Sequence, residues 1–188
     1  MQRYGVIVMG VSAGGTAALR QLLPVFPTNY PLPIIVVQHL HPTQKNTLLV
    51  HFDNLCPLTV KEADEKEAIR PGHIYFAPPN YHLLIERERT FALSIDEKVN
   101  YSRPSIDVLF ESAVDVYGAG VIGVVLTGAN NDGAAGLQVI KAHGGLTLVQ
   151  DPATAEVPYM PQAAIAAIQV DHILPIPAIG ELLLKIEV

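Results

Sequence analysis

Cysteine, positive charge and long apolar segments are all scarce in this sequence. Cys56 is the single cysteine, so no intramolecular disulfide can form, which is typical of proteins from a reducing compartment. The apolar runs have the length of strands rather than the roughly 20 residues of a membrane helix, and residues 1–10 are too short for a signal peptide. We therefore expect a cytoplasmic protein that does not insert into a membrane.

Charged residues make up only 16% of the chain, and 12 Lys and Arg face 18 Asp and Glu, which gives a formal net charge of -6. No basic cluster is present. Because phosphate binding requires clustered cations, we expect no nucleic-acid partner. Hydrophobic residues make up 49% of the 188 residues, which is enough for a substantial core. We expect residues 1–188 to form a single domain.

Short apolar runs alternate along the chain with segments whose apolar residues recur at helical spacing. The predicted strands are 4–9, 34–37, 58–61, 123–126, 146–150 and 172–174. The predicted helices are 14–23, 43–54, 102–117, 131–143, 161–168 and 179–186. Between them, the short segments 72–77, 82–86 and 91–95 are predicted to be antiparallel strands at one edge. The pattern predicts an α/β fold with a doubly wound, mainly parallel sheet flanked by helices, and with an antiparallel edge hairpin.

Ligands of such sheets bind beyond the carboxyl ends of the strands. The loop after the first predicted strand is Gly10-Val11-Ser12-Ala13-Gly14-Gly15. A Gly-x-Ser-x-Gly turn between strand and helix exposes the serine hydroxyl beside helix N–H groups that can stabilise an oxyanion. Ser12 is therefore a candidate nucleophile, and the Ala13 N–H is a candidate oxyanion donor. Two other interpretations remain open here: Ser12 as the N-cap of the helix, or the glycines as a phosphate-binding turn.

Two further loops at predicted strand ends carry chemically capable residues. The second contains His39 and His41, and histidine is the usual general base near neutral pH. A capped strand end and a metal site that uses both rings are the alternatives. The third loop contains Asp132, which could cap the helix that follows it. A carboxylate at a helix N-terminus also stays ionised, as the residue that orients a catalytic imidazole must.

Six blocks in this order resemble the catalytic domain of the chemotaxis protein-glutamate methylesterases, over roughly Tyr4 to Ile176. The blocks are 10–15, Val36-Val37-Gln38-His39, Tyr75-Phe76-Ala77-Pro78-Pro79, 102–110 (SRPSIDVLF), 126–136 with its Leu-Thr-Gly and Asn-Asp-Gly-Ala-Ala-Gly segments, and 150–155 (QDPATA). The resemblance implies that residues 1–188 form one methylesterase-type catalytic domain. It assigns the triad to Ser12, His39 and Asp132, and it selects His39 over His41.

The resemblance implies hydrolysis of glutamate methyl esters on the cytoplasmic helices of chemoreceptors, and deamidation of receptor glutamines. In this mechanism the N–H groups of Ala13 and Ala129 stabilise the oxyanion, and Arg103 contacts an acidic receptor surface. No metal or organic cofactor is required. We also expect the chain to be without the receiver domain usual in the family, so that a separate receiver protein is a candidate regulatory partner.

Family members usually carry Gly-Met-Gly-x-Asp-Gly where this chain has Gly128-Ala129-Asn130-Asn131-Asp132-Gly133. This change alters the loop beside the expected oxyanion site. Two other functions remain alternatives: a metal-dependent hydrolase using His39, His41 and Asp132, and a non-catalytic module that binds nucleotide or receptor through loop 10–15.

Overall fold

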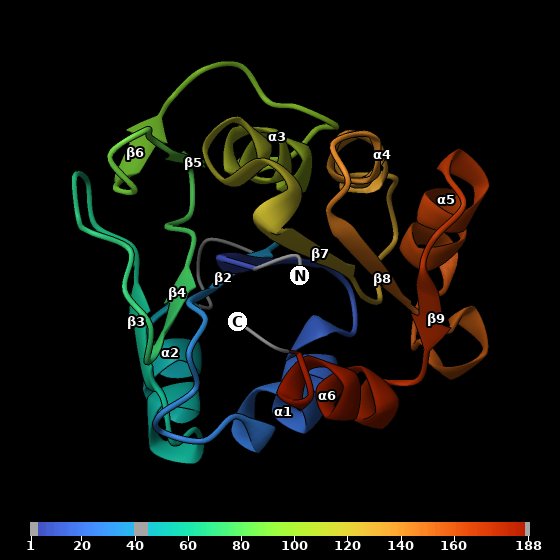
Figure 1. Cartoon of the computed structure of the whole chain (residues 1–188), viewed down its shortest axis with the longest axis horizontal. Helices are drawn as coiled ribbons and strands as arrows, with labels where there is room; N and C mark the ends of the chain where they lie inside the picture. The colour runs from blue at the N-terminus through green and yellow to red at the C-terminus, as the bar shows by residue number, and fades with distance from the viewer. Residues whose placement is uncertain (1–3, 40–44, 187–188) are drawn as a thin grey trace.

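The computed structural model describes residues 4–39 and 45–186. Within these ranges a seven-stranded parallel sheet forms the centre of the protein (Figure 1). In spatial order its strands are β3 (Thr59–Glu62), β4 (His73–Phe76), β2 (Ile34–Gln38), β1 (Val6–Val11), β7 (Val121–Val125), β8 (Leu146–Gln150) and β9 (His172–Leu174). The chain runs outward from β1 in both directions, which is the doubly wound order.

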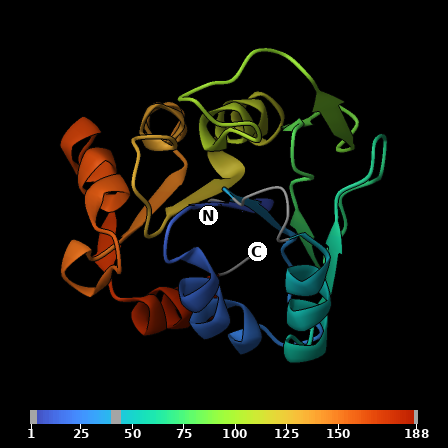
Figure 2. The same ribbon diagram turned by 180° about the vertical axis from the view of Figure 1, so that it is seen from behind.

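Helices cover both faces of the sheet. One face carries α1 (Gly15–Leu22), α2 (Lys45–Leu55) and α6 (Ile176–Leu184), and the other carries α3 (Ile106–Tyr117), α4 (Ala134–Ala142) and α5 (Tyr159–Ala167) (Figures 1 and 2). Short 3₁₀ turns occupy Leu23–Val25, Gly118–Gly120 and Pro152–Thr154. None of the helices in the described ranges combines the length and apolarity that crossing a membrane requires.

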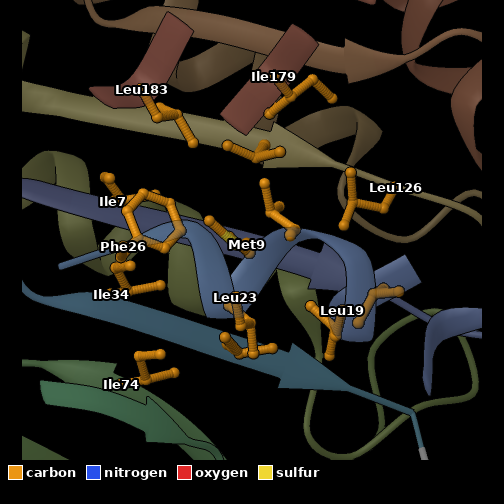
Figure 3. Packing of buried hydrophobic residues seen from close by; sticks show 14 of the residues in the cluster. Ile7, Met9, Leu19, Leu23, Phe26, Ile34, Ile74, Leu126, Ile179 and Leu183 are labelled. Carbon is orange, nitrogen blue, oxygen red and sulfur yellow. The ribbon is translucent and has the colours of Figure 1, made fainter. Parts of the chain in front are cut away.

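Strand β1 shows why the central strands have no polar alternation. Ile7 and Met9 belong to the core beneath α1 and α6 (Figure 3), whereas Val6 and Val8 belong to the core beneath α3 and α4. Successive side chains of a strand point to opposite faces, and here both faces are covered. All six residues of β1 are therefore buried, as expected for an interior parallel strand.

The predicted α/β class with its doubly wound, mainly parallel sheet is confirmed. The antiparallel hairpin is present as β5 (His82–Ile85) and β6 (Phe91–Ser94). The two strands form a sheet of their own, and β5 packs against α3. The inclusion of 72–77 among the antiparallel strands was wrong, because β4 pairs in parallel with both β2 and β3. Its Ile74 and Tyr75 are fully buried, so β4 lies inside the sheet, and the prolines that follow it end the strand.

The register brings three loops together at one edge of the sheet. Val11 pairs with Gln38, and Gly10 pairs with Val125. Strands β1, β2 and β7 are adjacent and parallel, so the residues that follow them leave the sheet side by side. These residues begin the loops predicted to carry the functional side chains.

Candidate active site

Ser12 lies in a tight turn between β1 and α1. Its N–H donates to Thr127 O at 3.0 Å, and its carbonyl accepts from Gly15 N at 2.9 Å. Gly14 has a φ of 77° and occupies the N-cap position of α1, a left-handed conformation that favours glycine. A Cβ at Gly128 would lie 2.9 Å from the Cβ of Ser12. The small residues around Ser12 therefore permit a close approach of the loops after β1 and β7, and the N-cap role considered for Ser12 belongs to Gly14.

His39 begins the loop that follows β2, directly beside Ser12. Its backbone N–H donates to Val11 O at 3.0 Å, which continues the pairing of β1 with β2. Its Nε2 lies 2.9 Å from Asp132 Oδ2, and its side chain is 13% exposed. Because a carboxylate only accepts hydrogen bonds, this contact places the imidazole proton on Nε2 and leaves the lone pair on Nδ1. The other candidate of this loop, His41, lies outside the described residues.

Asp132 is a fully buried carboxylate that accepts hydrogen bonds from five donors. The donors are His39 Nε2, Asn100 Nδ2, Ser105 Oγ, Ile106 N and Asp107 N, at 2.7–3.1 Å. Burial by itself raises the pKa of Asp132. The hydrogen bonds from His39, the Ile106 N–H and Asn100 outweigh burial, so the pKa stays below its ordinary value. Asp132 is thus held as a carboxylate, the form that orients and stabilises a charged imidazole.

The helix that Asp132 caps is not the one that follows it in sequence. The expectation that it caps the helix after its own loop was wrong: Gly133 is the N-cap of α4, without a side-chain cap. Asp132 instead accepts from the first N–H groups of α3. The loop after β7 packs against the start of α3, and the unpaired N–H groups there give a carboxylate better partners than its own helix does.

Asp107, in the first turn of α3, caps α4 in return. Its Oδ1 accepts from Gly133 N at 2.9 Å and Gly136 N at 2.6 Å, and its Oδ2 accepts from Asn100 Nδ2 at 2.7 Å. Burial, followed by the nearby charge of Asp132, raises the pKa of Asp107 to about 6. Sequence reasoning missed this residue. An acidic residue in the first turn of a predicted helix was a usable signal, but it indicates a cap of its own helix rather than of another.

Asn130 faces the second ring nitrogen of His39. Its Oδ1 accepts from Asp132 N at 3.1 Å, which fixes the side chain, and its Nδ2 lies 3.5 Å from His39 Nδ1. The described side chains of Ser12 and His39 are not hydrogen bonded to each other. A proton from Ser12 has to reach Nδ1, so the amide of Asn130 stands next to the atom that would receive it.

A model of the CheB methylesterase family matches residues 7–183 of the chain. The chain belongs to this family. A relative from Leptospira interrogans is 52% identical over 98% of this chain and 95% of its own length. The protein-glutamate methylesterase/protein-glutamine glutaminase of Thermotoga maritima is 35% identical over 96% of this chain, which spans 54% of that protein. The crystal structure of the Thermotoga maritima CheB methylesterase catalytic domain superimposes with a TM-score of 0.93 over 98% of this chain and 99% of that one, at 35% identity.

In this member of the CheB methylesterase family, Ser12 and His39 open onto one cleft. The cleft has a volume of about 550 Å³, and Ala13, Arg20 and Glu156 also line it. A second cavity of about 200 Å³ shares His39 with the cleft and is lined by Arg103. The expected substrate-binding residues are thus distributed: Ala13 is exposed in the first cleft, and Arg103 lines the second.

Arg103 and Ala129, both expected to contact the substrate, lie on two different loops. Arg103 Nη1 donates to the carbonyls of Ile95 and Asp96 at 2.7 and 2.9 Å, so its guanidinium anchors the loop before α3. Ala129 is exposed on the loop that carries Asn130.

Within the ranges 4–39 and 45–186, no three His, Cys, Asp or Glu side chains are arranged to hold a metal ion.

Proposed function

We propose that this chain is a protein-glutamate methylesterase that also deamidates glutamine, with Ser12 as nucleophile, His39 as base and Asp132 as the carboxylate that orients it. The observation that carries the proposal is the 2.9 Å bond between His39 Nε2 and the buried Asp132 at the strand end beside Ser12. The name of the Thermotoga maritima relative, which is protein-glutamate methylesterase/protein-glutamine glutaminase, agrees with it.

In the first half of the reaction, Nδ1 of His39 takes the proton of the Ser12 hydroxyl while Oγ of Ser12 bonds to the ester carbonyl carbon. The tetrahedral oxyanion accepts hydrogen bonds from the Ala13 N–H in the turn before α1 and from the Ala129 N–H, in the way that backbone N–H groups stabilise oxyanions in other acyl transfers. The imidazolium is stabilised through Nε2–H by Asp132. When the intermediate collapses, the C–O bond to the methoxy group breaks, and Nδ1 gives its proton to the departing methoxy oxygen, which leaves as methanol.

In the second half, water adds to the acyl-enzyme by the same route. Nδ1 takes a proton from the water, and its oxygen bonds to the carbonyl carbon. The bond to Ser12 then breaks and the serine regains its proton from Nδ1, which leaves a glutamate side chain with a free carboxylate on the receptor. With a glutamine side chain the same steps release ammonia in place of methanol. No step requires a metal or an organic cofactor.

The proposed partner is a methylated cytoplasmic helix of a chemoreceptor, which would place the protein in the cytoplasm. We further propose that residues 1–188 act as one catalytic domain, and that a separate receiver protein is the regulator. Arg103 lines the cavity beside His39, which supports its role in contacting an acidic receptor surface.

The decisive experiment measures methanol released from methylated receptor. Ser12→Ala is expected to lower kcat by about 10⁴-fold or more, because the nucleophile of a triad cannot be replaced by its neighbours. Ser94→Ala, on the hairpin strand β6, serves as the matched control and should retain the activity. Equal turnover by wild type and Ser12→Ala would end the serine mechanism.

A further inference from the structure

A strained turn lies on the rim of the site, in the loop between β6 and α3. Val99 N donates to Ser102 O at 3.2 Å, and Ser102 N donates to Val99 O at 2.9 Å, so Asn100 and Tyr101 form the tip of a two-residue hairpin. Their φ angles are 50° and 63°. These angles are those of a type I′ turn, in which both positions lie in the left-handed region, and this suits Asn or Gly. A bulky residue such as Tyr is rare there, because its side chain makes that conformation costly.

The two residues at the tip have opposite surroundings. Asn100 Nδ2 donates to Asp107 Oδ2 at 2.7 Å and to Asp132 Oδ1 at 3.0 Å, so this side of the turn is anchored on two buried carboxylates. Tyr101 is 98% exposed, so its ring contributes no packing to the fold. Residues in unfavourable backbone regions tend to lie where function requires them. Tyr101 is such a case, because its backbone is in the left-handed region and its ring is exposed to solvent.

The surroundings of Tyr101 indicate what it could contact. It lines the cavity of about 200 Å³ that contains His39, together with Lys98 and Arg103. The acidic residues of the same loop, Asp96 and Glu97, are not among the described residues that line this cavity. On a chain with a net charge of -6, the Lys and Arg side chains that line this cavity are thus both cations.

The loop also presents apolar surface next to this cavity. Ile95 is 73% exposed and Val99 is 36% exposed, and Arg103 holds the carbonyl of Ile95 in place. Aromatic and arginine side chains are the residue types most enriched at the energetic centres of interfaces. An acidic helix with an apolar stripe complements this combination of an exposed ring, aliphatic groups and two cations.

We infer that Tyr101 is a specificity-determining residue that docks the helix bearing the methyl ester, beside His39. This inference rests on the proposed function and adds the surface on which its macromolecular substrate lies. The ester enters the cleft at Ser12, and the rest of the helix lies across the rim with its glutamates near Lys98 and Arg103. A free amino-acid ester is too small to reach both places.

The test compares kcat/KM for methylated receptor with kcat/KM for the γ-methyl ester of free glutamate, both followed as methanol release. Tyr101→Ala and Tyr101→Gly are expected to lower the receptor-to-small-ester ratio by about tenfold, mainly through a higher KM for receptor, since losing one central aromatic contact commonly has this effect. Tyr101→Phe should retain the ratio. Ile173→Ala, an exposed apolar residue on β9, is the control and should leave it unchanged.

A second measurement separates docking from damage to the fold. Tyr101→Gly relieves the left-handed conformation and is expected to raise Tm by about 2–4 °C, while the receptor ratio falls. An unchanged ratio in both Tyr101→Ala and Tyr101→Gly would overturn the docking role, whether the two activities stay at the wild-type level or fall equally. The proposed function fails in a different way, through Ser12→Ala retaining activity on both.

Discussion

Asp132→Asn should separate the orientation of His39 from the stability of the loop that carries it. The carboxylate accepts from five donors, two at Oδ2 and three at Oδ1. An asparagine has one acceptor oxygen, so one set of donors has to face an NH₂ group. Placing the NH₂ at the Oδ2 position disturbs fewer of them, namely His39 Nε2 and Ile106 N.

The two disturbed donors have different fates. The imidazole can switch tautomer and accept from the new amide through Nε2, but its proton then sits on Nδ1. In that tautomer His39 cannot take the proton of Ser12, and the same substitution in a serine protease triad lowers kcat about 10⁴-fold with the geometry intact. The Ile106 N–H has no such alternative, and a buried donor without an acceptor costs about 1–3 kcal/mol of folding stability.

The assay is methanol release from methylated receptor, together with urea unfolding of the same samples. Asp115→Asn is the matched control, because Asp115 lies on α3 with its side chain exposed, and it should change neither quantity. A folded Asp132→Asn protein that keeps more than about a tenth of the wild-type kcat would refute the argument from the tautomer. An unchanged free energy of unfolding would refute the argument from the hydrogen bonds.

Three further predictions test neighbouring parts of the network. The pKa of Asp107 is raised from 3.8 to about 6, so the folded state binds this proton more tightly than the unfolded chain, and stability from this group is lost as pH rises from about 4 to about 6. Relative to Asp107→Asn, wild type should therefore lose up to about 3 kcal/mol across that window, measured by urea unfolding at several pH values; a constant difference would contradict this. Asn130→Asp keeps an oxygen that can accept from Asp132 N but puts a carboxylate near Nδ1 of His39. A negative charge there favours the protonated imidazole, so the acidic limb of the pH–activity profile should move to higher pH. Asn131→Asp, one residue further on, is the control and should move this limb less. Gly128→Ala would place a Cβ 2.9 Å from the Cβ of Ser12 and should lower both activity and stability, the latter by about 1–3 kcal/mol. If the Gly128→Ala protein had the methanol release and Tm of wild type, the loops could separate without cost and the prediction would be wrong.

Much of the fold could be predicted from local patterns. Continuous β-branched runs such as 34–37 predicted buried strands, and the spacing of Leu19 and Leu22 predicted the helix between the first two. The prediction that was wrong concerned the strands with which 72–77 pairs. A short strand followed by two prolines has the same local sequence at the edge of a sheet as inside it, and only the fit of β4 between β2 and β3 decides.

The candidate site shows the same division between local and long-range information. The glycine-rich turn at Ser12 and the histidine after β2 follow from residues that are neighbours in sequence. The contacts of Asp132 do not, because its cap partner Ile106 is 26 residues away. The N-terminus of a helix predicts that some acceptor will bind its free N–H groups, but the sequence alone does not say which residue supplies this acceptor. Asp107 was missed for this reason.

The exchange of caps between α3 and α4 explains how two buried carboxylates can be neighbours while only one of them titrates near neutral pH. Asp132 accepts from five donors and Asp107 from three, and Asn100 donates to both. At Asp132 the denser set of donors outweighs burial and favours the charged form. At Asp107 burial, followed by the nearby charge of Asp132, outweighs the smaller set of donors, so its pKa is the one that is raised. Asp107 thus takes up a proton before Asp132 does as the pH falls. The carboxylate that faces His39 remains charged over the range in which an imidazole base can act.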